Sequence, residues 1–243
     1  MAEQATERKW GMVVDIDRCT GCQACVIACQ AENNIMLSTE DVFQQKRAMT
    51  WLRIERYWEG EFPNVKARFI PVMCQHCENA PCEPVCPVYA TYHNNEGLNV
   101  QVYNRCVGTR YCFNNCPYKV RYFNWFQYEW PAPLDWGLNP DVTVREKGVM
   151  EKCTYCVQRI NAAKIAIKDQ DPEAVIPDGF FQTACQQTCP TEAIVFGNLK
   201  DPQSRAARLA GGELAYSVLE MLNTRPANFY LRQVHQRFDE APA

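Results

Sequence analysis

Cysteine is the residue type in this chain whose number and spacing indicate chemistry most directly. Fifteen cysteines fall into four groups, and the third group holds three where each of the others holds four. The first group reads C-x2-C-x2-C-x3-C, a spacing that places three thiolates on one cubane iron–sulfur cluster and sends the fourth to a neighbouring cluster. The groups are Cys19, Cys22, Cys25 and Cys29; Cys74, Cys77, Cys82 and Cys86; Cys106, Cys112 and Cys116; and Cys153, Cys156, Cys185 and Cys189. Four metal centres without a recognisable dinucleotide or phosphate-binding motif indicate a protein that transfers electrons.

Two other uses of cysteine fit this pattern less well. Disulfides are disfavoured because the number of cysteines is odd and because eight of the fourteen gaps between successive cysteines hold only two or three residues. Zinc sites also use C-x2-C pairs, so a structural zinc protein stays open as an alternative. The four-cysteine run of the first group, together with proline after the last cysteine of the other three, favours iron–sulfur clusters.

The last cysteine of each group is expected to cross to the cluster of its partner group. The first and fourth groups then pair with each other, and the second and third groups pair between them. This rule predicts four ligand sets, which we name centres I to IV. Centre I takes Cys19, Cys22, Cys25 and Cys189; centre II takes Cys29, Cys153, Cys156 and Cys185; centre III takes Cys74, Cys77, Cys82 and Cys116; and centre IV takes Cys86, Cys106 and Cys112.

Centre IV lacks one ligand. The third group reads C-V-G-T-R-Y-C, so Thr109 stands where the second cysteine of a complete group would be. A threonine hydroxyl is a hard donor with a high pKa and is a poor iron ligand. We therefore expect a [3Fe-4S] cluster at centre IV and [4Fe-4S] clusters at the other three, with a four-iron cluster bearing an oxygen ligand as the alternative.

Short elements must position these cysteines. The alternation of apolar and polar residues over Trp10–Asp17 predicts a strand that leads to the first group. Trp51–Trp58 and Val65–Met73 read as a hairpin that delivers Cys74. Short helices are expected after the third cysteine of each group, most clearly over Ala24–Glu32, and a further helix over Asn161–Lys168. Because proline cannot continue a helix, each Cys-Pro pair turns the chain away, whereas Cys29-Gln30 lets the first helix continue.

These features predict an α+β protein: a duplicated two-cluster, bacterial-type ferredoxin fold with insertions and an extended C-terminal tail. The iron–sulfur domain is expected over residues 1–200 and a docking tail over 201–243, helical over Ser204–Thr224 and extended over Pro226–Phe238. Within the domain we expect an outer module of residues 10–50 with 150–197, an inner module of residues 51–125, and an aromatic insertion over residues 118–152. The insertion either shields the inner centres from water or forms an interface with a partner.

Charged and histidine residues near the cysteines leave two interpretations open. Seven cations are either solvated surface charges or tune the reduction potentials of the centres; they are Arg18, Arg105, Arg110, Lys119, Arg121, Lys152 and Arg159. His76 lies between Cys74 and Cys77, where packing around the centre is favoured over direct ligation of iron. His93 and His235 carry no recognisable motif.

Composition excludes some classes of function. The formal net charge is −3 and no basic block is present, so we expect no nucleic-acid partner. No stretch approaches the ~20 apolar residues that a membrane helix needs. The first residues lack the apolar segment of an export signal, so we expect them to encode no export signal of their own.

Five stretches of the chain carry a resemblance to a known family: residues 17–25 (DRCTGCQAC), 105–123 (RCVGTRYCFNNCPYKVRYF), 151–160, 184–197 (ACQQTCPTEAIVFG) and 222–226. They resemble the four-cluster iron–sulfur subunits of molybdopterin-type membrane oxidoreductases such as polysulfide, dimethyl-sulfoxide and nitrite reductases. With Thr109 in place of a cysteine, the chain resembles in particular the ferredoxin-like part of the iron–sulfur protein of alternative complex III. Alternative complex III is a bacterial quinol:electron acceptor oxidoreductase. Its iron–sulfur protein usually carries a large molybdopterin-fold domain ahead of this part, so the chain would be a split form.

The resemblance implies an electron-transfer subunit without a catalytic residue of its own. Its implied partners are an integral membrane quinol-binding subunit, a molybdopterin-fold large subunit that can lack its cofactor, and multi-haem cytochrome c subunits. It also implies a peripheral position on the membrane, on the periplasmic face by export with a partner, with the cytoplasmic face left open. The alternative function is the electron relay of a molybdopterin reductase or dehydrogenase.

Overall fold

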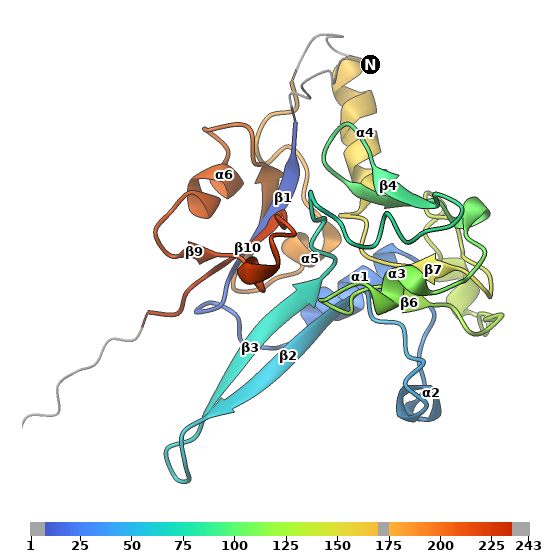
Figure 1. Cartoon of the computed structure of the whole chain (residues 1–243), viewed down its shortest axis with the longest axis horizontal. Helices are drawn as coiled ribbons and strands as arrows, with labels where there is room; N and C mark the ends of the chain where they lie inside the picture. The colour runs from blue at the N-terminus through green and yellow to red at the C-terminus, as the bar shows by residue number, and fades with distance from the viewer. Residues whose placement is uncertain (1–7, 170–174, 235–243) are drawn as a thin grey trace, which may run out of the picture.

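A four-stranded sheet lies at the centre of the protein in a computed structural model that describes residues 8–169 and 175–234 (Figure 1). The strand order is β8-β1-β10-β9. β1 (Trp10–Asp15) pairs antiparallel with β8 (Ile194–Asn198) and parallel with β10 (Asn228–Leu231), which pairs antiparallel with β9 (Ala215–Tyr216). Both faces of β1 are buried: Met12 and Val14 face the cysteine-containing core, and Val13 packs with Val195 and Ala206. The expected strand before the first cysteine group is confirmed.

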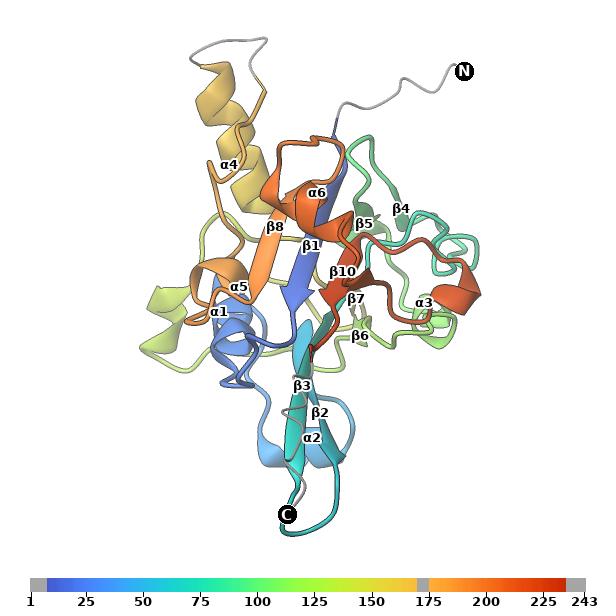
Figure 2. The same ribbon diagram turned by 90° about the vertical axis from the view of Figure 1, so that its left-hand side faces the viewer.

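The expected hairpin is also present and projects from the body of the molecule (Figures 1 and 2). β2 (Leu52–Glu59) pairs with β3 (Lys66–Met73) along its whole length, from Leu52 opposite Met73 to Glu59 opposite Lys66. The base of the hairpin is buried and its tip is exposed. β3 ends at Met73, so the buried end of the hairpin delivers Cys74 directly into the core.

Two further strand pairs complete a repeated arrangement around the cysteine groups. β4 (Thr91–His93) pairs with β5 (Asn99–Gln101), and β6 (Tyr122–Phe123) pairs with β7 (Met150–Glu151). A strand precedes each group: β1, β3, β5 and β7 in chain order. β5 reaches its group through the 3₁₀ turn η1 (Tyr103–Arg105). The strands therefore act as supports that bring the cysteine loops to the core.

The element after each group depends on the residue that comes directly after its last cysteine. α1 (Ala24–Glu32) has the expected bounds and continues past Cys29, whose next residue is glutamine. The three Cys-Pro groups lead instead into β4, β6 and β8. α3 (Tyr111–Asn114) and α5 (Ala184–Gln187) carry the third and fourth groups and end before the prolines. The second group forms turns, so the helix expected there is absent from the described residues.

The remaining elements lie at the periphery. The expected helix over Asn161–Lys168 is present but begins four residues earlier, as α4 (Val157–Lys168). α2 (Glu40–Gln44) is capped by the Thr39 side chain, which accepts from Val42 N–H. The other short elements are α6 (Arg205–Ala210), η2 (Leu134–Gly137) and η3 (Glu220–Leu222). Among the described residues, no helix has the length and apolar character needed to cross a membrane.

The C-terminal segment differs from the expected tail. Ser204–Thr224 is helical only over α6 and η3, and β10 lies inside the central sheet beside β1. Tyr230 is fully buried, and its hydroxyl donates to the carbonyl of Pro71 at 2.9 Å. Parallel pairing with β1 removes water from both partners, so the described part of this segment is structural. Residues 235–243, and His235 with them, lie outside the described residues; docking by residues 201–243 stays a prediction.

The aromatic insertion is anchored to the end of α1 by polar contacts. Asn34 and Asn139 exchange hydrogen bonds, from Asn139 N to Asn34 Oδ1 at 2.8 Å and from Asn34 Nδ2 to the Asn139 carbonyl at 2.9 Å. Arg145 donates to the carbonyls of Asn33 and Asn34 and pairs with Glu151, all in buried surroundings. Trp136 is 85% exposed, so at least this aromatic side chain does not shield the core.

Candidate iron–sulfur sites

The thiols assigned to centres I and II lie close enough to influence one another's pKa. Burial, followed by the charges of Cys19, Cys189 and Cys22, raises the pKa of Cys25 to about 12. Cys189 comes from the other end of the chain, so this contact joins the first and fourth groups. In the same way, burial and the charges of Cys153, Cys156 and Cys185 raise the pKa of Cys29 well above its ordinary value. The last cysteine of each of these two groups thus lies with the other group.

The thiols assigned to centre III also influence one another. Burial and the charge of Cys74, with smaller contributions from Cys82 and Cys116, raise the pKa of Cys77 to about 12. Cys116 is the last cysteine of the third group and lies with the second. For centre IV the structure places the three cysteines one by one: Cys112 faces the guanidinium of Arg121, while Cys86 and Cys106 accept backbone hydrogen bonds.

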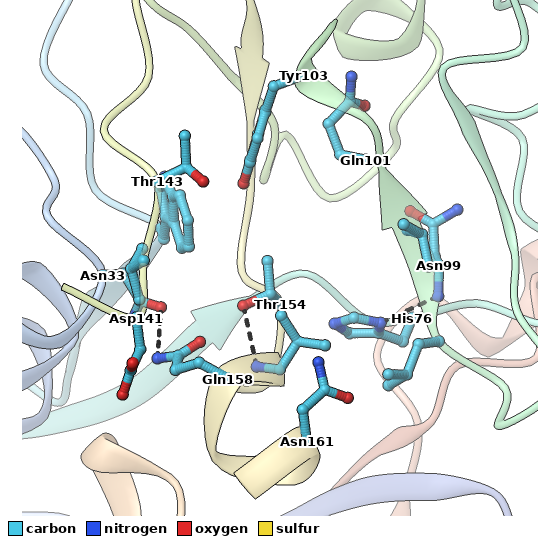
Figure 3. Close-up of a pocket in the computed structure, with 15 residues that line it drawn as sticks. Asn33, His76, Asn99, Gln101, Tyr103, Asp141, Thr143, Thr154, Gln158 and Asn161 are labelled. Atoms are coloured by element: carbon cyan, nitrogen blue, oxygen red, sulfur yellow. Dashed lines mark hydrogen bonds between the residues drawn. The ribbon is translucent and has the colours of Figure 1, made fainter. Parts of the chain in front are cut away.

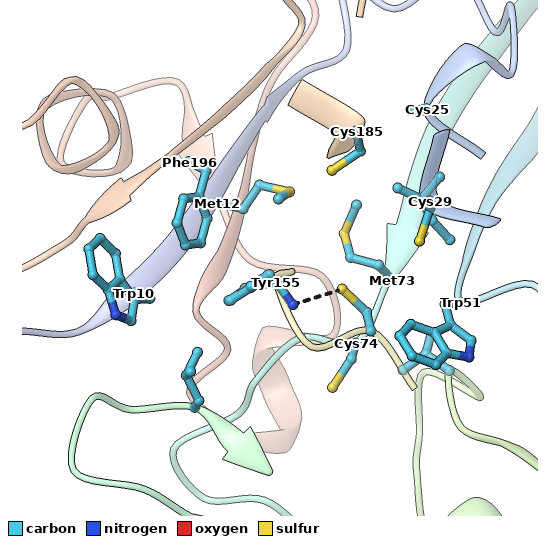
Figure 4. Packing of buried hydrophobic residues seen from close by; sticks show 14 of the residues in the cluster. Trp10, Met12, Cys25, Cys29, Trp51, Met73, Cys74, Tyr155, Cys185 and Phe196 are labelled. Carbon is cyan, nitrogen blue, oxygen red and sulfur yellow. Dashed lines mark hydrogen bonds between the residues drawn. The ribbon is translucent and has the colours of Figure 1, made fainter. Parts of the chain in front are cut away.

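The four sets lie one after another in space. The charge of Cys25 raises the pKa of Cys185, which brings centre I beside centre II. The charge of Cys74 raises the pKa of buried Cys153, which brings centre II beside centre III. Met73 is fully buried and belongs to the same buried cluster as Cys185 and Cys74 (Figure 4). Arg121 faces thiols of both centre III and centre IV. The order is therefore I, II, III, IV.

The Cys-Pro loops share a backbone motif that donates to sulfur. The third residue after the cysteine has a positive φ in each loop, 51° at Tyr89, 52° at Lys119 and 52° at Glu192. This turn directs the next backbone N–H at the thiol: Ala90 N lies 3.2 Å from Cys86 Sγ, and Ala193 N lies 3.3 Å from Cys189 Sγ. Burial alone would raise the pKa of Cys189, but hydrogen bonds from Thr191 and Ala193 hold it below its ordinary value. N–H donors of this kind stabilise thiolate and help to set cluster potentials.

Thr109 occupies the backbone position of a ligand cysteine. In the first group Gly21 and Gln23 flank Cys22 with φ values of 71° and 63°. In the third group Gly108 and Arg110 flank Thr109 with φ values of 72° and 63°. Both central residues are exposed. The two loops are therefore folded alike, and threonine supplies a hydroxyl where the first loop supplies a thiol.

His76 and Tyr155 hold equivalent places in the second and fourth groups, each directly before the second cysteine. Both have positive φ, and their rings stack with centroids 3.9 Å apart. His76 Nδ1 accepts from Asn99 N at 3.2 Å, and its Nε2 has no partner among the described residues. His76 borders a cavity of about 210 Å³ that also contacts Thr154 and Gln158 (Figure 3). Sequence reasoning placed His76 beside the centre but did not find the stacking; the equivalent position of Tyr155 could have indicated it.

The seven cations near the cysteines divide into two kinds. Arg121 and Lys152 are buried, with 1% and 0% exposure, and the others are exposed or half-buried. Burial alone would lower the pKa of Arg121, but the charges of Cys82, Cys112 and Cys74 outweigh it and raise the pKa. Lys152 Nζ donates to the carbonyl of Cys153 at 2.8 Å. Solvation accounts for the exposed cations and does not account for these two.

The composition of these sites fits anionic iron–sulfur clusters. Thiolates are soft donors that suit iron in such clusters. Backbone N–H groups and a buried guanidinium point at the sulfurs, as a buried negative charge requires. His93 pairs instead with Glu83, Nδ1 to Oε1 at 2.6 Å, and does not join a thiol group.

Comparison with known proteins identifies the cysteine pattern. Two family models match, both described as a 4Fe-4S dicluster domain, over residues 18–90 and 65–132. Together they cover the first three cysteine groups. They support iron–sulfur clusters over the zinc alternative and support the expected tandem, ferredoxin-like arrangement with mixed helices and strands. The number and type of clusters stay predictions.

Relatives cover nearly the whole chain. The chain is 45% identical to the iron–sulfur cluster-binding subunit of menaquinone reductase from Nitratidesulfovibrio vulgaris, over 92% of this chain and 88% of the relative. It belongs to the family of iron–sulfur subunits of molybdopterin-type oxidoreductases. Other relatives are the iron–sulfur subunit of a putative dimethyl sulfoxide reductase from Halobacterium salinarum (35% identity; 91% and 78% covered) and an iron–sulfur subunit of an Hdr-like menaquinol oxidoreductase from Archaeoglobus fulgidus (34%; 95% and 86%).

These relatives favour the alternative function over the assignment to alternative complex III. Their names describe reductase and menaquinol oxidoreductase subunits, and they do not support the finer assignment of this iron–sulfur subunit to alternative complex III. The alternative function, an electron relay in a molybdopterin-type complex, fits them better. The names of these relatives also give no support to the expected cytochrome partners.

Proposed function

We propose that this iron–sulfur subunit relays electrons between a membrane quinone-binding subunit and a molybdopterin-fold large subunit. The observation that carries the proposal is a series of close contacts between thiols assigned to successive centres. Cys25 acts on Cys185, Cys74 acts on Cys153, and Arg121 faces Cys82 and Cys112. When bound, the clusters supply one-electron transfer. The chain itself contributes the thiolates, their order, and the exclusion of water from the buried sulfurs.

The ligand sets proposed for the clusters are those of the crossing rule. Three sets of four thiolates would hold [4Fe-4S] clusters, and the three thiolates of centre IV would hold a [3Fe-4S] cluster. The common fold of the Cys22 and Thr109 loops supports this difference, because the hydroxyl stands at the place of a thiolate ligand. A three-iron cluster generally has a higher potential than its four-iron counterpart, which suits exchange of electrons with a quinone.

The quinone proposed as the redox partner is menaquinone. The support is the 45% identity to a menaquinone reductase subunit over nearly the whole of both chains. Alternative complex III stays a second candidate only through the Thr109 replacement. We place the subunit at the membrane surface, on the periplasmic face after export with a partner.

The test is purification of the native assembly with its subunits, metals and quinone identified. The proposal expects a membrane subunit, a large subunit of the molybdopterin fold, and clusters that become reduced when a menaquinol analogue is added anaerobically. A cofactor-free large subunit together with multi-haem cytochromes would instead support alternative complex III. Clusters that stay oxidised in the presence of menaquinol and reduced in the presence of menaquinone would contradict the proposed electron exchange. Protease protection in spheroplasts would decide the side of the membrane.

A further inference from the structure

Arg121 is buried between the two inner centres. It lies after the third cysteine group, directly before β6, and its exposure is 1%. Its Nη1 lies 3.4 Å from Cys82 Sγ, a predicted ligand of centre III. The guanidinium also faces Cys112, a predicted ligand of centre IV. One cation therefore faces sulfurs of both centres.

Apart from the cysteine sulfurs, the hydrogen-bond partners of Arg121 are neutral amides. Nη1 donates to Asn99 Oδ1 at 3.1 Å and Nη2 donates to Gln101 Oε1. The carboxylate of Glu83 contacts Asn99 rather than the guanidinium. Among residues 8–169 and 175–234, no carboxylate forms an ion pair with Arg121.

A second buried arginine, Arg145, differs from Arg121 because its charge is compensated by a carboxylate. Arg145 is also buried, and it pairs with the carboxylate of Glu151 at 2.9 Å. Arginine remains protonated in proteins, and a buried charge is strongly unfavourable unless an opposite charge compensates it. For Arg121, the anionic groups that it faces within the described part of the chain are the cysteine sulfurs.

We propose that Arg121 is the shared counter-ion of centres III and IV, and that it favours the reduced form of both. The inference rests on the proposed function, since it requires clusters at these two ligand sets. Reduction adds negative charge at a poorly solvated place, and a fixed positive charge close by stabilises that added charge. Because the same cation faces both centres, it stabilises an added electron on either of them.

The test is an anaerobic redox titration of the full chain, monitored by EPR spectroscopy. Arg121→Gln removes the charge and keeps a hydrogen-bonding side chain. We expect it to disfavour reduction of both inner centres about tenfold, which is about 59 mV for a one-electron couple. Arg121→Lys keeps the charge and should restore most of this shift. The three-iron signal of the oxidised protein reports on centre IV separately from the four-iron signals of the reduced protein.

Arg18→Gln is the matched control. Arg18 directly precedes Cys19, but its side chain is 53% exposed and pairs with Asp15, so water and the carboxylate already screen its charge. We expect less than about a twofold change at any centre. Unchanged inner potentials in Arg121→Gln, with the iron content of the parent, would overturn the proposal, and so would an equal shift in Arg121→Lys.

A further variant decides the matter if Arg121→Gln fails to retain its clusters. Gln101→Glu keeps Arg121 and its hydrogen bond and places a carboxylate against the guanidinium. The proposal then expects both inner potentials to fall, and no change would overturn it. Iron analysis of the parent protein separates failure of the proposed function from failure of this inference. A parent without iron would refute the clusters themselves. A parent with its iron, whose cluster potentials do not change in these variants, would refute only the role of Arg121.

Discussion

The imidazole of His76 lies flat against the phenol ring of Tyr155, with ring centroids 3.9 Å apart and an interplanar angle of 22°. Each residue stands directly before the second cysteine of its group, and each has a positive φ, 43° and 55°. The loops of the second and fourth groups therefore meet through equivalent residues. This contact joins the inner and outer halves of the protein at the place where centres II and III are neighbours in the order.

Tyr155 also links this contact to the C-terminal strand, and its hydroxyl can be tested. The hydroxyl donates to Asn228 Oδ1, and both residues are buried. Tyr155→Phe keeps the stacked ring and leaves the amide oxygen without its donor, which costs about 1–3 kcal/mol. We expect the midpoint of thermal unfolding to fall by several degrees at a fixed scan rate. Tyr216→Phe, whose ring is half-buried, is the control and should change the midpoint little; equal effects in the two variants would contradict a structural role for the Tyr155 hydroxyl.

Thr109→Cys tests the missing ligand of centre IV. The backbone around Thr109 matches that around Cys22, so a cysteine at this position needs no rearrangement to face the cluster. We expect about one more iron per chain and loss of the three-iron EPR signal from the oxidised protein. Thr109→Ser, which offers a hydroxyl again, should keep that signal. An unchanged iron content in Thr109→Cys would show that Thr109 is not what limits ligation.

Two C-terminal deletions test whether β10 has a structural role at the predicted centres. Asn228 in β10 donates from Nδ2 to the carbonyl of Cys74 at 3.2 Å, so the strand supports a predicted ligand of centre III. Deletion of residues 226–243 should therefore lower the iron content by at least one cluster. Deletion of residues 232–243 leaves β10 in place and should keep the iron content of the parent. Full iron content in the longer deletion would mean that β10 is a dispensable tail.

The ion pair between Glu32 and Arg159 predicts a pH dependence. It joins α1 to α4, with Arg159 Nη2 2.7 Å from Glu32 Oε2. Burial alone would raise the pKa of Glu32, but hydrogen bonds from Arg159 and Gln158 hold it below its ordinary value. A lowered pKa stabilises the fold above that value, and the stabilisation is lost as the pH falls through the lower pKa of the folded state.

Arg159→Gln should therefore raise the pH at which clusters are lost on acidification. Removal of the guanidinium allows Glu32 to be protonated at a higher pH, so the link between the two helices weakens earlier. Visible absorbance measured against pH gives the onset of cluster loss. Arg208→Gln, near the end of α6, is the control. The same onset in both variants would contradict a role for the pair.

Local spacing allowed the sequence to predict much of this structure. β1, the β2–β3 hairpin and α1 follow from alternation, turn residues and the absence of proline after Cys29. The crossing rule predicted that the first and fourth groups pair, and their thiols lie near one another; ligation of shared clusters stays a prediction. Such features depend on neighbours in the sequence or on a fixed chemical pattern.

Two features could not be predicted because long-range packing decides them. β10 is four residues long and begins directly after Pro226-Ala227, so nothing in its own sequence indicates a parallel partner in β1, at the other end of the chain. The burial of Arg121 was equally hidden, since it was one of seven cations near cysteines. Only the fold separates the two buried cations, Arg121 and Lys152, from those that water solvates.

Iron and acid-labile sulfide analysis of anaerobically purified protein, with Mössbauer spectroscopy of the iron, tests the central claim most directly. Three four-iron clusters and one three-iron cluster predict about fifteen irons and about sixteen sulfides per chain. Colourless protein without acid-labile sulfide, but with the native fold, would contradict it.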